Sequence, residues 1–207
     1  MKILPIGLSS WLIELDSGER AMSLYTYLSS LWRTIPAISD LVPGARTILL
    51  DCERPGLART QLTAILDGWN ASDAELAGPA EAVEIPVHYD GDDLPEIAQL
   101  AGCTEAEVIA MHGAADLRVA FCGFSPGFAY LSGLPSKLHL PRLAVPRTAV
   151  PAGSVALAAG YTGVYPRQSP GGWRIIGHTT VTLWDTERTP PALLTPGTPV
   201  RFTAVTA

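Results

Sequence analysis

The first ninety residues alternate apolar runs with segments of helical periodicity. Residues 2–15 are mostly apolar and β-leaning, so we expect them to form an opening strand. Apolar side chains then recur at helical spacing, at Ala21, Leu24, Tyr25, Leu28, Leu31 and Trp32. Residues 45–52 predict a second strand, residues 57–66 a helix that Gly68 ends, and residues 82–89 a third strand. This βαβαβ order predicts a two-layer α+β unit with its helices on one face of a sheet.

The next thirty residues predict two short helices. Asp93 and Glu96 have the spacing of a capping pair for a helix over residues 94–101, which Gly102 would end. Thr104 with Glu107 forms a capping box for a helix that ends near His112.

The pattern changes after Val119. From Phe121 to Trp184, Gly and Pro supply 16 of 64 residues and separate short β-type runs, which predicts many short strands joined by turns. Residues 196–205 predict one closing strand. The second half is therefore expected to be a β-barrel or a β-sandwich.

Composition narrows the class of protein. A chain of 207 residues allows one large domain or two small ones, and no apolar run approaches the roughly 18 residues of a membrane span. Pro5, Gly7 and Glu14 interrupt the first residues, so we expect no signal peptide. Three widely spaced cysteines without a CxxC pattern indicate neither a disulfide framework nor a zinc site, and they fit a protein of the reducing cytoplasm.

Charge is divided unevenly along the chain. The net charge of −6 argues against a general nucleic-acid binder. The segment from Phe121 to Trp184 nevertheless contains no Asp or Glu and carries five bases, namely Lys137, Arg142, Arg147, Arg167 and Arg174. Such a segment suits an anionic ligand. The alternative is that these bases pair with acids of the first half across a domain interface.

One short motif matches a hydrolase pattern and is rejected. Residues 123–127 read GFSPG, which fits the GxSxG nucleophile elbow. The residue after the nucleophile must donate its backbone N–H to the oxyanion hole, and here that residue is Pro126, which has none. The later acids, Asp185 and Glu187, are followed by no His. A serine hydrolase is therefore not expected.

Three features are candidates for anion binding. The glycines of Ser169–Gly172 permit a nest of backbone N–H groups, although a tight turn before the next strand is the simpler alternative. Arg142 and Arg147 each follow Pro, which lowers the entropy cost of presenting two guanidinium forks to a carboxylate or phosphate, unless they form ordinary ion pairs. His178 could donate or accept a proton, although a structural His is the commoner outcome. The four His residues have no metal-binding spacing, and no metal site is expected.

A long ordered block of motifs resembles one known family. Residues 123–179 contain GFSPGFAYL, two Pro-Arg pairs five residues apart, VPAGSV, TGVYP and SPGGW. The block resembles the family of the 5-oxoprolinase B subunit and allophanate hydrolase subunit 1, which includes a sporulation-kinase inhibitor and part of the carboxyltransferase module of urea carboxylase. A weaker resemblance extends upstream through VHYDGDDL and EVIAMH. The chain departs from the family pattern at Tyr161, where Gln is expected, and at His178, where Arg is expected.

The resemblance implies a fold, partners and a reaction. We expect a ferredoxin-like α+β domain over residues 1–84 and a cyclophilin-like β-barrel over residues 85–207. The implied role is one component of a cytoplasmic complex that opens 5-oxo-L-proline to L-glutamate with ATP and magnesium. The implied partners are the related C subunit of oxoprolinase, or allophanate hydrolase subunit 2, and an amidohydrolase-like A subunit. The family also allows a non-catalytic histidine-kinase inhibitor or part of a urea carboxylase module, and it implies no covalently bound cofactor, nucleic acid or membrane.

The expected site draws on these motifs and on the resemblance. Arg142, Arg147, Ser169, Gly171 and Gly172 are the candidates for binding substrate or phosphate, and His178 is the candidate catalytic group. The residues expected to shape the pocket are Phe124, Pro126, Gly127, Tyr130, Tyr165, Gln168 and Trp173.

Overall fold

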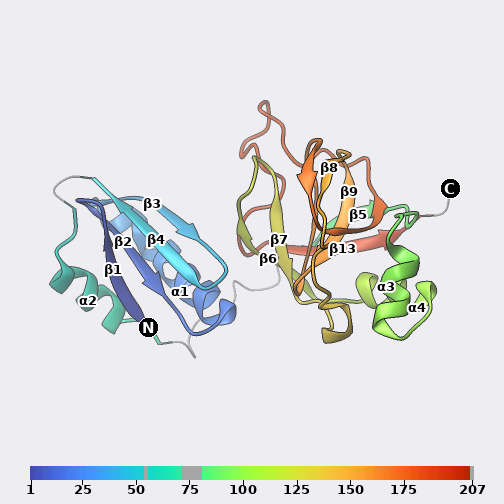
Figure 1. Cartoon of the computed structure of the whole chain (residues 1–207). Helices are drawn as coiled ribbons and strands as arrows, with labels where there is room; N and C mark the ends of the chain where they lie inside the picture. The colour runs from blue at the N-terminus through green and yellow to red at the C-terminus, as the bar shows by residue number, and fades with distance from the viewer. Residues whose placement is uncertain (54–55, 71–80, 206–207) are drawn as a thin grey trace. The chain divides into compact units, whose positions relative to one another are not determined.

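The computed structural model describes residues 1–53, 56–70 and 81–205 (Figure 1). The chain divides into two compact units, Met1–Ala80 and Glu81–Ala207. Residues 81–84, which we expected to close the first domain, therefore belong to the second unit. The mixture of helices and antiparallel strands confirms the α+β class.

The first unit is a four-stranded sheet with two α-helices. Its elements in chain order are β1 (Lys2–Ile6), β2 (Ser10–Glu14), α1 (Gly18–Leu31), the short 3₁₀ helix η1 (Trp32–Thr34), β3 (Ile38–Pro43), β4 (Thr47–Cys52) and α2 (Arg59–Asp67). The strands are ordered β1-β2-β4-β3, and all neighbours are antiparallel.

The expected βαβαβ order of this unit is wrong. Residues 2–15 form a hairpin of β1 and β2 rather than one strand, and Gly7 supplies the left-handed backbone of the turn at φ 61°. The periodicity also gave no sign of β3, and the strand expected at residues 82–89 lies in the second unit. A mostly apolar run shows its length but not the point at which it reverses, which explains the first error.

Alternation along the strands places one face of this sheet against both helices. Ile13, Ile48 and Leu50 are fully buried with Leu24 and Leu28 of α1 and Leu62 of α2. Ser17 begins α1, where its hydroxyl accepts from the Arg20 N–H at 3.3 Å. Gly68 ends α2 as expected, because its N–H donates to the carbonyl of Ile65.

The second unit is a barrel with two helices. Its elements in chain order are β5 (Val83–Val87), α3 (Leu94–Ala101), α4 (Glu105–Gly113), β6 (Leu117–Cys122), β7 (Ala129–Ser132), the short η2 (Ser136–Leu138), β8 (Arg147–Val150), β9 (Ser154–Ala158), β10 (Tyr161–Val164), β11 (Ser169–Gly171), β12 (Arg174–His178) and β13 (Pro199–Ala204). Seven strands form one sheet in the order β12-β9-β10-β7-β6-β13-β5, and β8 pairs with β11 in a second small sheet.

Backbone hydrogen bonds join the two edges of the seven-stranded sheet. His88, just after β5, exchanges two bonds of 2.9 Å with His178 of β12, and Gly91 donates to Ile176 at 3.2 Å. A Cβ on Gly177 would lie 2.2 Å from the His88 carbonyl oxygen, so only glycine fits at this close approach. The barrel expected from the Gly-rich and Pro-rich texture is therefore present.

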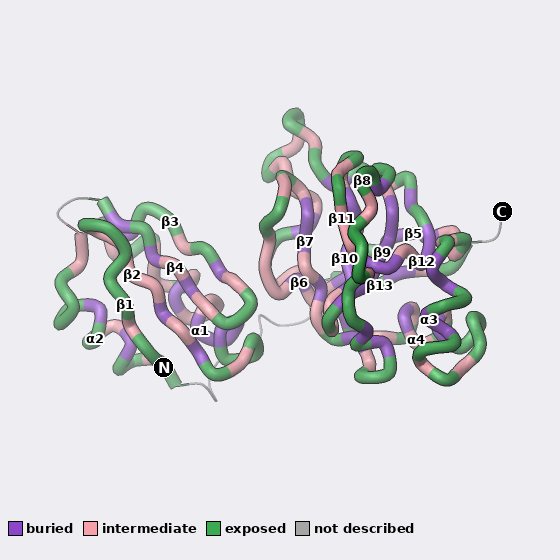
Figure 2. The backbone as a smooth tube through the Cα atoms, in the orientation of Figure 1, coloured by how far each residue is buried: buried purple, intermediate pink, exposed green. Residues whose placement is uncertain are grey.

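The barrel core is apolar and receives side chains from both helices. Ile97 of α3 and Val108 of α4 are fully buried with strand residues such as Ile85, Val119 and Leu157. Figure 2 shows buried stretches in α3, α4 and the barrel strands. The expected capping box of α4 is confirmed, because the Glu107 carboxylate accepts from the Thr104 N–H at 2.8 Å and the Thr104 hydroxyl from the Glu107 N–H at 3.2 Å. Gly102 ends α3 in the left-handed region, as expected.

Candidate functional site

Seven aromatic side chains gather on one part of the barrel. Phe128, Tyr165 and Trp173 are buried, and the Phe128 ring lies 5.3 Å from Tyr165 and 5.4 Å from Trp173, edge to face. Tyr130 lies 5.4 Å from Trp173 and stacks on Phe121 at 4.2 Å. The remaining members of this aromatic cluster are Tyr161 and Phe124. The structure thus brings together the expected pocket residues Phe124, Tyr130, Tyr165 and Trp173.

The small sheet of β8 and β11 brings two candidate binding segments together. Gly171 pairs with Arg147, and Ser169 pairs with Val150. Ser169–Gly171 is thus a strand, and a bend at Trp173 leads into β12. A Cβ on Gly171 would lie 2.2 Å from the Tyr165 hydroxyl, so glycine is required beside this aromatic side chain.

Arg147 is held by an acid whose spacing in the sequence indicated helix capping. The Arg147 Nη2 atom lies 2.7 Å from Oδ1 of Asp93, and the second carboxylate oxygen accepts from the Ile175 N–H at 2.7 Å. The Asp93 side chain makes no capping bond to α3, so the expected Asp93 and Glu96 capping pair is wrong. The hydrogen bond to Asp93 raises the pKa of Arg147, which keeps the guanidinium charged.

The segment from Phe121 to Trp184 contains no acid, but acids from an earlier part of the chain pair with two of its bases. Asp93 pairs with Arg147, and Glu96 lies 2.6 Å from Nη1 of Arg174. These two bases therefore pair with acids of the first half of the chain, but the expected domain interface is wrong, because both pairs lie within the second unit. These acids and bases lie more than fifty residues apart in sequence, and they meet because α3 packs against β12.

The positive charges of Arg142 and Arg147 both lower the pKa of the Tyr165 hydroxyl. Burial raises the pKa of Tyr165, whereas a hydrogen bond from the Trp173 backbone and the positive charges of Arg142 and Arg147 oppose that rise. Arg142 is exposed, and Arg147 is partly buried. Leu143, next to Arg142, donates its N–H to the Gly172 carbonyl at 2.8 Å, and Arg147 pairs with Gly171 beside the Tyr165 hydroxyl. The two guanidinium groups and the aromatic cluster therefore form one candidate site for a small anion with an apolar body.

The GFSPGF loop between β6 and β7 borders this cluster. Phe124 has a left-handed backbone at φ 69°, which is uncommon for a bulky residue. The residue is 59% exposed, and its ring lies beside Phe128 and Tyr165. The Ser125 hydroxyl is buried without a hydrogen-bond partner among the described residues. Gly127 follows Pro126 and approaches Trp184, where an added Cβ would lie 2.8 Å from the Trp184 Cβ. A strand rather than a helix follows Ser125, which agrees with the rejection of a nucleophile elbow.

His178 has partners other than the two arginines of the candidate site. Its Nδ1 atom lies 2.8 Å from Asp90 Oδ1, and its ring stacks on His88 at 5.0 Å.

Among the other expected residues, Gln168 is exposed just before β11. Tyr161, one of the two departures from the family pattern, lies in the aromatic cluster, 5.9 Å from Tyr130.

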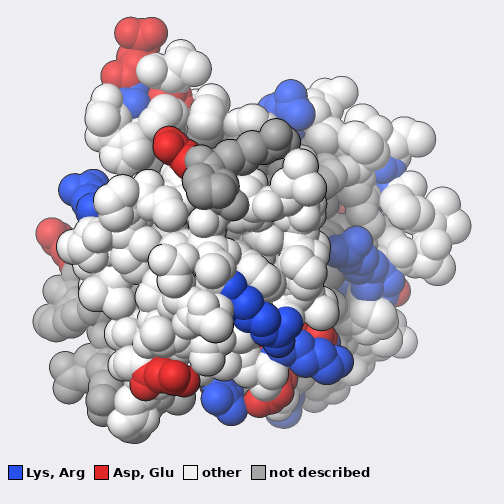
Figure 3. Space-filling model, turned by 90° about the vertical axis from the view of Figure 1, so that its left-hand side faces the viewer, with Lys and Arg blue, Asp and Glu red and all other residues white. Residues whose placement is uncertain are grey.

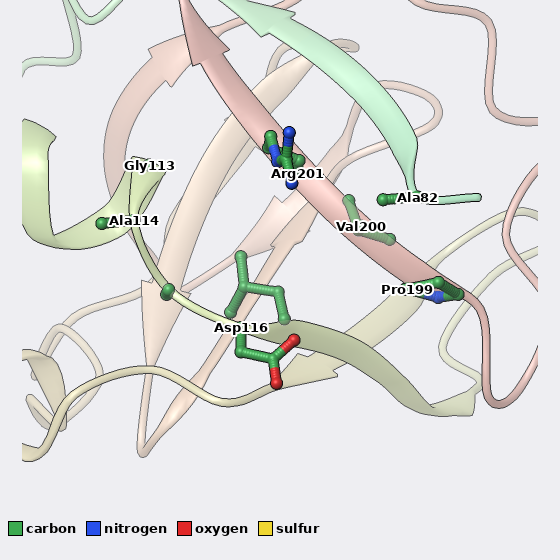
Figure 4. Close-up of a pocket in the computed structure, with 9 residues that line it drawn as sticks. Ala82, Gly113, Ala114, Asp116, Pro199, Val200 and Arg201 are labelled. Atoms are coloured by element: carbon green, nitrogen blue, oxygen red, sulfur yellow. The ribbon is translucent and has the colours of Figure 1, made fainter. Parts of the chain in front are cut away.

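A separate pocket of about 340 Å³ contains none of the expected site residues (Figure 4). It lies where the end of α4 meets β13, and Asp116 and Arg201 are its charged residues. No motif in the sequence points to this pocket, because its other lining residues are small or apolar.

The described part of the chain has no preformed metal site. Residues 1–53, 56–70 and 81–205 contain no group of three or more His, Cys, Asp or Glu residues placed to hold a metal ion.

Over the same ranges, no helix has the length and apolar character that crossing a bilayer requires. On the face that Figure 3 shows, Lys and Arg lie scattered among acids and large uncharged areas.

Comparison with known proteins identifies the family. Residues 1–194 match the family model of the carboxyltransferase domain, subdomain C and D. The chain belongs to this carboxyltransferase family. It is 42% identical over 172 residues to the 5-oxoprolinase B subunit of Escherichia coli O157:H7, an alignment that covers 81% of this chain and 78% of the relative. It is also 46% identical over 123 residues to the 5-oxoprolinase B subunit of Haemophilus influenzae, over 58% of each chain.

Solved structures with a similar fold cover nearly the whole of this chain. TTHA0988 superposes with a TM-score of 0.80 at 35% identity, over 96% of this chain and 40% of that longer chain. The Pyrococcus horikoshii protein PH0987 gives a TM-score of 0.58 at 33% identity, over 99% of this chain and 97% of that one. The Kluyveromyces lactis urea amidolyase, at 19% identity and a TM-score of 0.69, shares the fold over 16% of its length.

Proposed function

We propose that this chain is the B subunit of an ATP-dependent 5-oxoprolinase that opens 5-oxo-L-proline to L-glutamate. The observation that carries the proposal is the 42% identity over 172 residues to a protein named as the B subunit of 5-oxoprolinase. The site agrees with this substrate. 5-Oxoproline has one carboxylate and a small five-membered ring, and the site has two guanidinium groups beside an aromatic cluster.

The residues of this chain have distinct roles in the proposal. Arg142 and Arg147 hold the substrate carboxylate, because a planar guanidinium fork matches a carboxylate in geometry and charge. The aromatic cluster packs against the ring and keeps water away from it. The proposal also includes ATP and magnesium, which bind in the assembled complex.

The proposal includes two partners, the related C subunit and the amidohydrolase-like A subunit. Three large apolar side chains support a partner surface near the site. Phe124 is 59% exposed, Trp184 is 40% exposed, and Val145, between the two arginines in sequence, is 81% exposed. Aromatic and apolar residues of this kind form the centre of protein interfaces. We therefore place the partner contact over the barrel segment 121–184 and the active cleft beside it, and we expect the complex in the cytoplasm.

Reconstitution tests this proposal directly. The purified chain alone is expected to release no ADP or glutamate from ATP and 5-oxoproline. The chain mixed with both partners is expected to release the two products in equal amounts. Turnover by the isolated chain would contradict the role of one component among several. A well-formed complex without turnover would contradict the oxoprolinase assignment.

A further inference from the structure

We propose that Asp93 is a positioning residue that fixes the guanidinium of Arg147 in the orientation that binds the substrate carboxylate. This inference rests on the proposed function, because it concerns the same anion site. It adds a residue from outside the signature block of residues 123–179, and from a helix terminus whose expected role was capping.

The contacts of Asp93 point away from its own helix. Its backbone φ and ψ of −93° and −4° give no capping geometry, and its side chain caps nothing. Instead, Oδ1 accepts from Arg147 and Oδ2 accepts from the Ile175 N–H, each at 2.7 Å. The Asp93 N–H also donates to the Ile175 carbonyl at 3.1 Å. Two hydrogen bonds therefore fix Asp93 to β12, and a third contact fixes Arg147 to Asp93.

Because the Asp93 carboxylate is buried, it needs charged and polar partners. The Asp93 side chain is 8% exposed, and a buried carboxylate is tolerated only when charged and polar partners surround it. Arg147 supplies the charge, and the short contact holds one arm of its fork. The Arg147 side chain as a whole remains 28% exposed, whereas its Nη1 atom is buried and has no hydrogen-bond partner among the described residues. A ligand carboxylate is the natural acceptor for an arginine fork that is held on one side.

A purely structural role is the competing explanation, and the same helix provides its control. Glu96, on the first turn of α3, pairs with Arg174 of β12 at 2.6 Å. This pair also joins α3 to the barrel, but it does not involve Arg147. If Asp93 only anchors α3, loss of either acid will have the same consequences.

Asp93→Asn separates positioning from anchoring. The Asn carbonyl oxygen can still accept from the Ile175 N–H, while its NH₂ group replaces the oxygen that faces Arg147. In the complex with both partners, we expect the KM for 5-oxoproline to rise about tenfold or more, with kcat changed less than about threefold. Glu96→Gln is expected to leave both constants within about twofold of the wild type. Equal changes in the two variants, or an unchanged KM in Asp93→Asn, would overturn the proposal.

A second measurement does not depend on turnover. In the chain alone, NMR can follow the guanidinium Nη–H signal of Arg147, assigned by its loss in Arg147→Lys. We expect a sharp, slowly exchanging signal in the wild type and in Glu96→Gln, and its broadening in Asp93→Asn. A sharp signal in Asp93→Asn would contradict positioning by Asp93. If the wild-type complex lacks oxoprolinase activity but the signals behave as expected, the proposed function fails while the positioning role stands.

Discussion

The two units of the chain bury different kinds of side chain. Within the described residues, the first unit buries a single polar side chain, Ser23, which accepts from the Trp69 indole N–H at 3.1 Å. Its ion pairs are exposed, as in Lys2 with Glu14, whose side chains are 73% and 36% exposed. The second unit buries a larger polar set, namely Asp93, His112, Ser154, Thr162, Arg174 and Thr179.

This difference separates structural support from candidate chemistry. A buried polar group costs free energy unless it finds a partner, so a fold retains such groups only in specific networks. His112, for example, lies 2.8 Å from the Tyr89 hydroxyl and 2.9 Å from the Thr162 hydroxyl. All candidate site residues belong to the second unit, where side chains distant in sequence meet around the closed barrel. The first unit has a simpler apolar core that requires no such pairing.

The largest expected effect comes from opening the barrel. Gly177→Ala would place a Cβ 2.2 Å from the His88 carbonyl oxygen, so β12 and the chain after β5 must separate. We expect a loss of about 3 kcal/mol or more in the free energy of unfolding, measured by urea denaturation. Gly123→Ala is the control, because an added Cβ there meets nothing within 4 Å, and it should change stability by less than about 0.5 kcal/mol. Equal stability of the two variants would show that closure does not hold the polar networks together.

Loss of an arginine fork is expected to lower the kcat/KM of the complex when the arginine lies in the candidate site of the second unit, and not when it lies in the first unit. Arg147→Lys and Arg142→Lys keep the charge but lose the planar fork, and each should cost about 1–3 kcal/mol in kcat/KM of the reconstituted complex. Arg46→Lys is the matched control, since Arg46 lies in the first unit with its side chain 60% exposed. Thermal melts of all three variants should be close to the wild type. Normal kinetics with much lower melting temperatures would make Arg142 and Arg147 structural residues.

The buried histidine predicts a loss of stability in acid. Burial lowers the pKa of His112 to about 3 from its ordinary value of 6.5, so the unfolded chain binds a proton that the folded chain excludes. This stability is complete above pH 6.5 and is lost as the pH falls toward 3, by about 1.4 kcal/mol per pH unit. Between pH 7 and pH 5 the loss is about 2 kcal/mol.

The matched variant for this test is His112→Gln, which does not titrate. Urea denaturation at both pH values should show a smaller loss for His112→Gln than for the wild type. The same loss in both proteins would assign the acid sensitivity to other groups.

The smallest expected effect belongs to the exposed charges of the first unit. Lys2→Gln removes the contact of 3.6 Å with Glu14. Because both groups face water, we expect the free energy of unfolding to change by less than about 0.5 kcal/mol, and less still at high salt. A loss above about 1 kcal/mol in urea denaturation would place structurally important charge in the first unit and weaken the contrast between the two units.

Local patterns explain the parts of the fold that could be predicted. The helices α1, α2 and α4, their ends at Gly68 and near His112, and the turn-rich barrel follow from periodicity, capping and Gly and Pro content. These signals act over a few residues, so one sequence displays them. The sequence did not indicate the hairpin of β1 and β2, because its turn consists of Gly7, Leu8 and Ser9 and contains only one strong turn residue.

The candidate site was only half predictable for the same reason. The sequence by itself determined the α+β class, the family resemblance and the presence of two Pro-Arg pairs in an acid-free segment. Only the tertiary structure decided that Asp93 contacts Arg147, 54 residues away, and the Ile175 backbone, 82 residues away. It also decided that His178 pairs with Asp90 and His88 at the barrel closure. Such partners are set by how α3 and the strands pack around a closed core, and packing over these separations leaves no local pattern in the chain.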